Sequence, residues 1–336
     1  MTETVLVTGG TGFIAQWCIV ELLRRGYRVR TTVRSPSREA AVRDAVSRVV
    51  DPADRLTCAV ADLTSDDGWD DAVASCDYVL HVASPLGLDG SGDLVAPARD
   101  GALRVLRAAT AAGVTRVVLT SAANTASPSS YRDEGVSDET LWTDPDTPGL
   151  QAYRKSKTLA ECAAWTFMET ADGPTTLATV LPGAVFGPIL DTENLGSVQV
   201  IGRMLRGRMP GTPRIGLEVV DVRDIADVHI RAMTAPEAAG QRFLATGEFI
   251  WMGDIAAVLR DRLGPDAAKV PTRTIPDAIV RLVALFDSEM RAITPGLGRK
   301  SRHTTAKAQQ LLGWRPRSAA DTITDCARSL IENGAA

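Results

Sequence analysis

The chain has 336 residues, of which 45% are apolar and 23% charged, and its formal net charge at pH 7 is −4. A chain of this length buries a large core, as one big domain or as two lobes, and the composition is typical of a soluble enzyme. The slightly acidic balance and the lack of a stripe of basic and aromatic residues argue against nucleic-acid binding. No apolar run is long enough to span a bilayer, so we expect no membrane partner.

The cysteines and histidines are scattered along the chain. Five cysteines, spread from Cys18 to Cys326, include no C-x-x-C pair, so we predict reduced packing residues in a reducing compartment, the cytoplasm. The three histidines, His81, His229 and His303, lie far apart without the spacing of metal ligands, so we expect no metal site. The first predicted strand begins close to the N-terminus, which leaves no room for a signal peptide.

A glycine-rich turn follows that first strand. Residues 5–15 read VLVTGGTGFIA, where a short apolar run indicates a buried parallel strand, and a helix then continues to about Arg25. Gly9 permits the tight turn, and Gly12 allows the backbone to approach a pyrophosphate bound by the helix N-terminus. The spacing of Gly9, Gly12 and Ala15 departs from that of a G-x-G-x-x-G motif, and Ala15 lies where a small residue allows close packing of helix and strand. The turn therefore predicts a dinucleotide-binding site.

The next predicted strand, residues 28–34, ends where the adenosine ribose of a bound dinucleotide should lie. An acidic residue at this tip would bind the ribose hydroxyls of NAD, but the chain reads Arg34-Ser35-Pro36-Ser37-Arg38. Guanidinium groups bind phosphate with a fixed fork of donors, so Arg34 and Arg38 suit a 2′-phosphate. We therefore predict a preference for NADP(H); the alternative is that both arginines are simply solvated at the start of a helix.

Strands and helices then alternate, which predicts an α/β fold with a doubly wound parallel sheet and right-handed crossovers. Ligands of such sheets bind at the carboxyl ends of the strands, where Asp62, Ser84, Ser121 and Pro182 fall. The predicted strands are residues 56–61, 78–83, 116–121 and 175–181, and the predicted helices are residues 69–75, 94–112 and 152–170.

The alternation becomes less regular after Gly187. Residues 188–216 are rich in Gly, Pro, Arg and Met, and we expect a partly mobile segment that covers the substrate. Further strands are expected at 218–221 and 241–246, and further helices at 223–233, at 251–263 and on either side of LGWRP. We expect a Rossmann core over residues 1–187 and a smaller, mainly substrate-binding lobe over residues 188–336, with elements that return to the core.

Tyr153 and Lys157 stand one helical turn apart in the stretch QAYRKSKTLAE. Residues four apart on a helix share a face, so the ammonium should lie near the phenol and lower its pKa below the usual value near 10. A tyrosine tuned in this way can transfer a proton to or from a substrate oxygen near neutral pH. The pair alone also fits an ordinary amphipathic helix, but the dinucleotide site upstream favours the catalytic interpretation.

Taken together, the motifs TGGTGFIA, TVRS, ADL, HVASP, RVVLTS, YRKSKTLAE, LPGAVFGP and VVDVRDIADVHI resemble the extended short-chain dehydrogenase/reductases. The most similar group is that of dihydroflavonol reductases, cinnamoyl-CoA reductases and microbial aldehyde or ketone reductases. The resemblance implies a Rossmann fold, NADP(H) and carbonyl/alcohol interconversion. It also implies that Tyr153 is the general acid and that Lys157 binds the nicotinamide ribose and tunes the tyrosine. The expected cofactor contacts are Gly9, Thr11, Gly12, Phe13, Ile14, Arg34, Arg38, Asp62, Leu63, Val82, Ala83, Ser84, Thr120, Tyr153, Lys157, Pro182, Gly183 and Val185.

One position departs from the family pattern. The family usually has two serines at the end of the fifth strand, and the second hydrogen-bonds the substrate carbonyl, whereas this chain has Ala122 there. Ser121 is our first candidate for the missing catalytic donor, with Asn124 and Thr125 as alternatives. A missing oxyanion donor typically costs about two to three orders of magnitude in rate. Either a neighbour substitutes, or the enzyme is slow, or the protein is not a reductase.

We therefore predict an NADPH-dependent reductase that converts a hydrophobic aldehyde or ketone to the alcohol, as a monomer or homodimer. Two alternatives stay open: a nucleotide-sugar epimerase or dehydratase of the same fold, and a protein that senses NADPH without catalysis. The hydrophobic substrate class rests on apolar side chains that we expect to face the substrate. These are Leu86, Leu88, Phe186, Ile189, Leu190, Met204, Leu205 and Met209.

Overall fold

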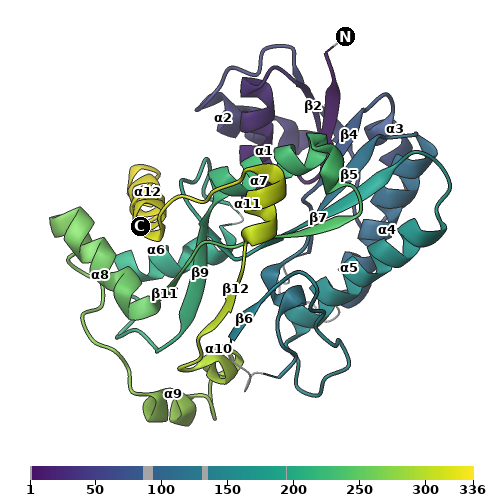
Figure 1. The fold of residues 1–336 in the computed structure, drawn as a ribbon. Coiled ribbons are helices and arrows are strands. Elements are labelled where there is room, and N and C mark those ends of the chain that lie inside the picture. Colours follow the sequence, from purple (N-terminus) through teal and green to yellow (C-terminus); the bar gives the residue numbers. More distant parts are fainter. Residues whose placement is uncertain (1, 86–93, 131–134, 194) are drawn as a thin grey trace.

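A parallel sheet of seven strands forms the centre of the computed structural model (Figure 1). The structure describes residues 2–85, 94–130, 135–193 and 195–336. The strand order is β3-β2-β1-β4-β5-β7-β10, so the chain starts inside the sheet, builds to one edge, and then returns to build the other. The strands are β1 Thr4–Val7, β2 Arg28–Val33, β3 Leu56–Val60, β4 Tyr78–His81, β5 Arg116–Thr120, β7 Thr176–Pro182 and β10 Gln241–Ala245. The predicted doubly wound sheet is confirmed.

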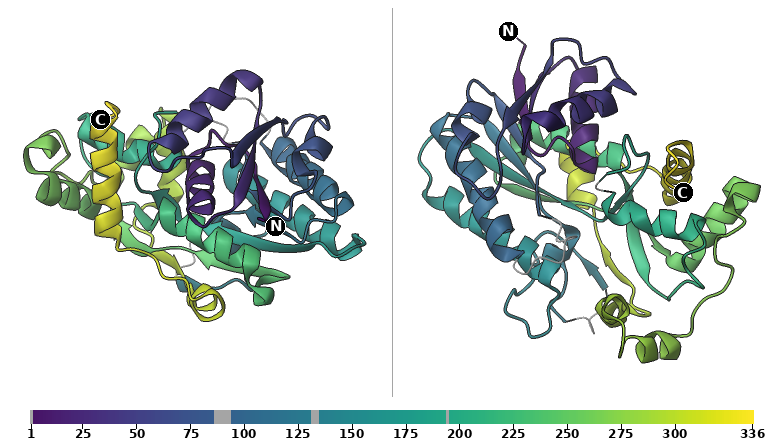
Figure 2. Two further views of the ribbon diagram at one scale, coloured as in Figure 1. Left: turned by 90° about the horizontal axis from the view of Figure 1, so that it is seen from above. Right: turned by 180° about the vertical axis from the view of Figure 1, so that it is seen from behind.

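Helices cover both faces of this sheet (Figure 2). Successive residues of a strand point to opposite faces, so a sheet that is covered on both sides needs strands that are apolar throughout. In β1, Val5 and Val7 are fully buried in one layer, whereas Leu6 is fully buried in the other. The first layer contains α1 Phe13–Arg24, α2 Glu39–Ser47 and α7 Val222–Thr234, and the second contains α3 Trp69–Val73, α4 Val95–Ala111 and α5 Ala152–Thr170.

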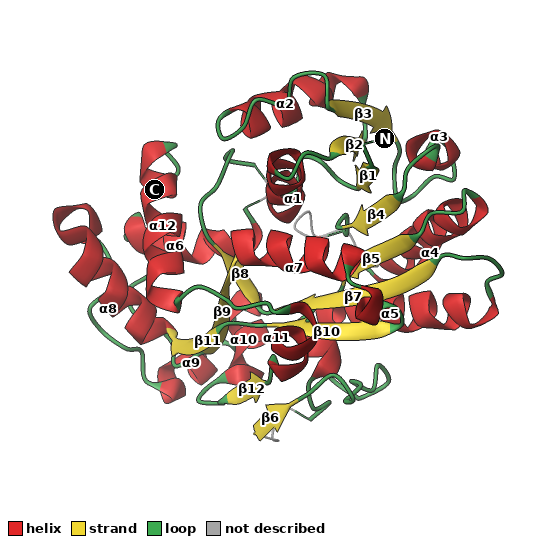
Figure 3. Ribbon diagram, turned by 45° about the horizontal axis from the view of Figure 1, so that its top comes forward, coloured by secondary structure: helices red, strands yellow, loops and turns green. Residues whose placement is uncertain are grey.

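A smaller lobe is built on a second sheet of three strands, β11-β9-β8 (Figure 3). Its strands β8 and β9 are parallel, and β11 is antiparallel to β9. A two-stranded parallel sheet, β12-β6, joins residues from the two halves of the sequence. The strands are β6 Gly135–Ser137, β8 Ala184–Phe186, β9 Gly216–Asp221, β11 Glu248–Trp251 and β12 Ser301–His303. The helices are α6 Gln199–Leu205, α8 Met252–Leu263, α9 Asp277–Val283, α10 Ser288–Ile293, α11 Ala306–Leu312 and α12 Ala319–Glu332.

The segment after Gly187 is more ordered than the composition predicts. Residues 199–205 form α6, and Val198, Ile201 and Met204 are fully buried in the core of the smaller lobe. These apolar residues recur every three positions, a helical spacing that the intervening Gly and Arg residues obscure. The segment therefore contributes to a hydrophobic core instead of forming a loose cover.

The apolar side chains expected to face the substrate are mostly core residues. Phe186, Ile189, Leu190, Met204 and Leu205 are all buried in hydrophobic clusters. Met209 is partly buried and packs against the same core as α6, while Leu86 and Leu88 lie outside the described residues. These side chains stabilise the lobe and give no direct information about a substrate.

Two elements of the second half of the chain, one strand and one helix, complete the main sheet and one of its covering layers. Strand β10 pairs with β7 in parallel, and α7 packs against α1 on the face that β1 helps to form. All five cysteines are free, as predicted. Within the described ranges, no helix combines the length and the apolar character needed to cross a membrane.

Candidate active site

The glycine turn between β1 and α1 is attached to the carboxyl end of β4. The Thr8 hydroxyl accepts the N–H groups of Val82 and Ala83 at 3.0 Å each, and it lies 2.9 Å from His81 Nδ1. With its oxygen accepting twice, the hydroxyl donates its hydrogen to His81, whose pKa is lowered by burial and then by the charge of Lys157 to about 3. Gly9 has φ +74°, and a Cβ there would lie 2.9 Å from the Ala83 Cβ, so only glycine permits this close approach.

The N-terminus of α1 lies directly after this turn. Gly12 precedes the helix and has no side chain that could cap it, and its own N–H donates to the Gly9 carbonyl at 2.8 Å. The first N–H bonded within the helix is that of Gln16, which donates to Gly12. Helix geometry leaves the N–H groups of Phe13 and Ile14 without intrahelical acceptors, and they suit a phosphate.

Arg34 and Asp62 approach each other at the carboxyl ends of β2 and β3. The pKa of Asp62 is lowered, chiefly by the hydrogen bond that the Thr64 hydroxyl donates at 2.7 Å and less by the charge of Arg34. Arg34 is exposed, so its guanidinium can meet a phosphate from solvent. Arg38, the second predicted phosphate ligand, instead forms an exposed ion pair with Glu193, which a phosphate would have to replace.

Tyr153 is the second residue of α5, and its side chain is accessible. The residue is 38% exposed, and among the described residues its hydroxyl has no hydrogen-bond partner. The surrounding protein raises the pKa of Tyr153 by partial burial, and the ammonium of Lys157 donates instead to the Thr120 carbonyl at 3.0 Å. The expectation that Lys157 lowers the tyrosine pKa is therefore wrong for this arrangement, because the ammonium is directed at β5 and not at the phenol.

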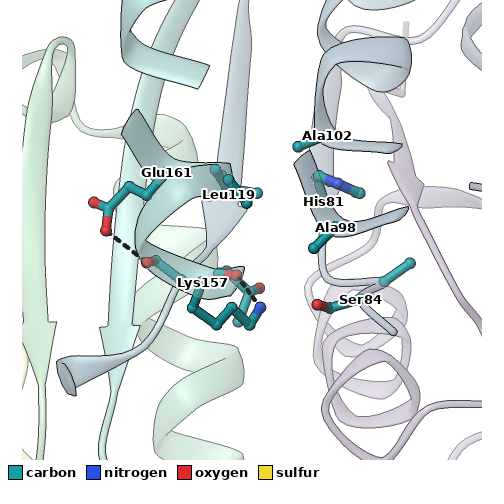
Figure 4. Close-up of a pocket in the computed structure, with 11 residues that line it drawn as sticks. His81, Ser84, Ala98, Ala102, Leu119, Lys157 and Glu161 are labelled. Atoms are coloured by element: carbon teal, nitrogen blue, oxygen red, sulfur yellow. Dashed lines mark hydrogen bonds between the residues drawn. The ribbon is translucent and has the colours of Figure 1, made fainter. Parts of the chain in front are cut away.

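Lys157 itself is buried beside a small pocket at the carboxyl ends of β4 and β5 (Figure 4). Burial lowers the pKa of Lys157 to about 8, although the charge of Glu161 opposes this effect. In Figure 4, Lys157 and Glu161 lie on one side of the pocket, and His81 and Ser84 lie on the other. The lining residues are His81, Ala83, Ser84, Ala98, Ala102, Leu119, Thr120, Ser121, Lys157, Ala160 and Glu161.

The remaining predicted contacts lie around this edge of the sheet. A Cβ on Gly183, in the turn after β7, would lie 2.5 Å from the Glu218 carbonyl oxygen, so this turn requires glycine. Pro182 ends β7, and Val185 is buried in β8. Leu63 packs against Gly101 of α4, and Thr11 lies within the glycine turn. In the described part of the chain, no cluster of three His, Cys, Asp or Glu side chains could hold a metal ion.

The model of the NAD dependent epimerase/dehydratase family matches residues 5–245 of the sequence. The chain belongs to this family. Cinnamoyl-CoA reductase 1 of Petunia hybrida is 37% identical over 262 residues, which cover 76% of each chain. A ketoreductase of Aspergillus niger is 32% identical over 354 aligned positions that cover 99% of this chain and 98% of its own. The predicted resemblance to extended short-chain dehydrogenase/reductases and the predicted enzyme class, oxidoreductase, are confirmed.

Solved structures agree with this placement in the epimerase/dehydratase family. Yeast methylglyoxal/isovaleraldehyde reductase Gre2, crystallised with NADPH, has a TM-score of 0.81 at 25% identity and covers 99% of this chain and 100% of its own. The UDP-glucose 4-epimerase of Thermotoga maritima has a TM-score of 0.76 at 19% identity, which shows a shared fold alone. The fold is thus common to reductases and epimerases of the family.

The neighbourhood of the missing family serine is occupied by a buried carboxylate. The Ser121 hydroxyl donates to Glu161 Oε2 at 2.6 Å, and the Thr125 hydroxyl lies 2.6 Å from the same oxygen. Ala122 is buried and offers only a methyl group. The side-chain oxygen of Asn124 is buried and has no hydrogen-bond partner among the described residues. Of the three predicted substitutes, two are therefore already bound to Glu161.

Glu161 and its partner Arg242 are not among the site residues that the sequence predicts. Glu161 follows Lys157 by four residues, so the spacing Tyr153-Lys157-Glu161 was a usable signal for a third polar group on the same helix face. Arg242 had no such signal, because it lies 81 residues further along the chain and meets Glu161 only through the pairing of β10 with β7.

Proposed function

We propose that the protein is an NADPH-dependent reductase that converts an aldehyde or ketone to the alcohol. The observation that supports this most is the accessible side chain of Tyr153 on the same helix as the buried Lys157, at the sheet edge where the glycine turn, Arg34 and Asp62 also lie. The reductase names of relatives that share 32–37% of their residues with the chain favour the same reaction.

Each part of the candidate site has a separate role in cofactor binding or in proton transfer. The N-terminus of α1 binds the pyrophosphate, and the exposed Arg34 binds the 2′-phosphate. NADPH, when bound by these residues, would supply the hydride for the carbonyl carbon. Tyr153 donates its proton to the carbonyl oxygen, and the buried ammonium of Lys157 provides positive charge beside the developing negative charge.

A hydrophobic aldehyde or ketone is the substrate class that we propose. Its support is the cinnamoyl and isovaleraldehyde groups in the names of similar proteins, both of which are uncharged and largely apolar. A panel of aliphatic and aromatic aldehydes and ketones, with UDP-glucose as a control, tests both the reaction and the class. Loss of NADPH absorbance with apolar carbonyl compounds is the expected result. NADPH binding without turnover of any member would instead support a sensing protein, and conversion of the nucleotide sugar would support an epimerase.

Substitutions at positions 121 and 122 test which group supplies the second hydrogen bond to the substrate oxygen. Because the single hydroxyl proton of Ser121 goes to Glu161, we expect Ser121→Ala to change kcat only a few-fold and to cost about 1–3 kcal/mol of stability. Ala122→Ser should raise kcat several-fold by restoring a donor at the family position. Steady-state kinetics and thermal melting of both variants measure these effects.

Ala123→Ser, one residue further on, is the matched control, since it adds the same hydroxyl at another buried position and should not raise kcat. If Ser121→Ala lowered kcat by two orders of magnitude without lowering the melting temperature, Ser121 would be the donor, as the sequence alone suggests.

A further inference from the structure

Glu161 is a buried carboxylate with an unusually complete set of partners. It is only 1% exposed and lies one turn after Lys157 on α5. Its Oε2 atom accepts the Ser121 hydroxyl and lies near that of Thr125, and its Oε1 atom accepts the Thr179 hydroxyl at 2.8 Å. Ser121 directly follows β5, Thr125 lies in the turn after it and Thr179 lies in β7, so one carboxylate attaches three parts of the sheet edge to the helix that carries Tyr153.

The charge of Glu161 is balanced by Arg242 of β10. Arg242 Nε donates to Glu161 Oε1 at 2.9 Å, and its Nη1 donates to the carbonyls of Glu139 and Leu141 at 2.7 and 3.0 Å. Its guanidinium carbon also lies 3.5 Å from the centre of the Trp142 ring. Burial raises the pKa of Glu161, but the charge and hydrogen bond of Arg242, together with the hydrogen bonds of Ser121 and Thr125, outweigh it, so the pKa is lowered and the group stays ionised.

The surroundings of Lys157 contain little else that would stabilise an ammonium. On its own helix, Tyr153 and Glu161 stand one turn on either side of it, and Glu161 acts on its charge; from β4 it meets His81, which is neutral, and from β5 the Thr120 carbonyl. Helix α4 contributes only Ala98 and Ala102 to the shared pocket, and Arg242 acts from the far side of Glu161. Among the described residues, Glu161 is thus the anion that acts on Lys157.

We infer that Glu161 is a positioning residue of the reductase, which keeps Lys157 charged in a buried site and fixes the end of β5 against α5. Both of its oxygens are engaged by protein groups, so it acts through Lys157, Ser121 and Thr125. The inference rests on the proposed function for its catalytic meaning, but the charge of Lys157 can be measured without any turnover.

The chain has five lysines, which makes a direct measurement practical. Lysine labelled with carbon-13 at Cε gives five NMR signals, and the signal that is missing from Lys157→Met belongs to Lys157. In the natural chain this signal should titrate near pH 8. In Glu161→Gln it should titrate about one pH unit lower or more, because the nearby opposite charge has been removed.

Thr179→Val is the matched variant, since it also removes a buried hydrogen bond of Glu161 but leaves Arg242, and with it the anion beside Lys157, in place. Its Lys157 signal should titrate near the natural value, although both variants lose stability. Because Lys157 regains its proton at lower pH, the kcat lost in Glu161→Gln should recover as the pH falls, whereas any kcat lost in Thr179→Val should not.

A Lys157 titration that stays unmoved in Glu161→Gln, or that falls equally in both variants, would overturn the inference and leave Glu161 a structural residue. If either single variant does not fold, the double variant Glu161→Gln/Arg242→Gln removes both charges together and should still titrate below the natural chain. Absence of reductase activity in the natural chain would overturn the proposed function while leaving the NMR result interpretable.

Discussion

Replacing Tyr153 with phenylalanine should lower kcat for carbonyl reduction by about two orders of magnitude or more. The substitution removes the transferable proton but keeps the ring, which is partly exposed and whose hydroxyl has no partner among the described residues. Folding should therefore be almost unaffected. Steady-state kinetics with NADPH and an accepted aldehyde, together with NADPH titration and thermal melting, measure the effect.

Tyr78→Phe is a suitable control for the loss of a phenol elsewhere in the fold. Tyr78 begins β4, and its hydroxyl makes only a long hydrogen bond, 3.4 Å, to Glu3. That variant should retain normal turnover. Near-normal turnover in Tyr153→Phe would show that another group donates the proton, and would contradict the assignment of Tyr153 as the general acid.

Replacing Arg34 with alanine should weaken NADPH binding by roughly 1.5–3 kcal/mol and leave NADH binding nearly unchanged. Only NADPH carries the 2′-phosphate, and Arg34 is exposed directly after β2, where its guanidinium can reach a phosphate from solvent. Dissociation constants for both cofactors, measured by nucleotide fluorescence at fixed ionic strength, give the ratio directly.

Arg28→Ala serves as the control, because it makes the same change in net charge at the opposite end of the same strand. It should shift neither dissociation constant appreciably. Equal losses of affinity for NADPH and NADH in Arg34→Ala would mean that Arg34 stabilises the loop and does not bind the 2′-phosphate. Arg38→Ala should have a smaller effect than Arg34→Ala, since Arg38 already has a carboxylate partner in Glu193.

The sequence predicts the central sheet well because most of its strands can be identified from a short apolar segment, without knowledge of distant residues. Val5–Val7 is a continuous apolar segment, and the runs at 78–83 and 116–121 have apolar centres, as buried parallel strands require; each lies on an observed strand. The predicted Tyr153 helix, residues 152–170, coincides with α5. In the smaller sheets, the strand predicted at 218–221 lies on β9, but β6 and β12 are not predicted because they are only three residues long and pair with each other across a long stretch of chain.

The chemistry of the candidate site is less predictable than its location. The spacing of Tyr153 and Lys157 places both on one helix face, but the direction of a long lysine side chain depends on acceptors that the sequence does not reveal, here the Thr120 carbonyl. For the same reason Ser121 is a plausible donor in the sequence, whereas in the structure its hydroxyl is bound to Glu161. The apolar residues of 186–209 could equally line a cavity or fill a core, and only the packing decides between them.

The contribution of β10 to the main sheet has a consequence for how the protein is made. Until the ribosome has passed residue 245, one side of β7 lacks its neighbouring strand, and until α7 is complete the face of α1 that packs against it is exposed. Exposed strand edges and apolar faces on incomplete chains favour aggregation. Residues 1–187 therefore cannot complete the sheet or its helical layer, and a fragment cut at Gly187 should fail to fold by itself. The nascent chain consequently needs protection from aggregation until most of its length has been synthesised.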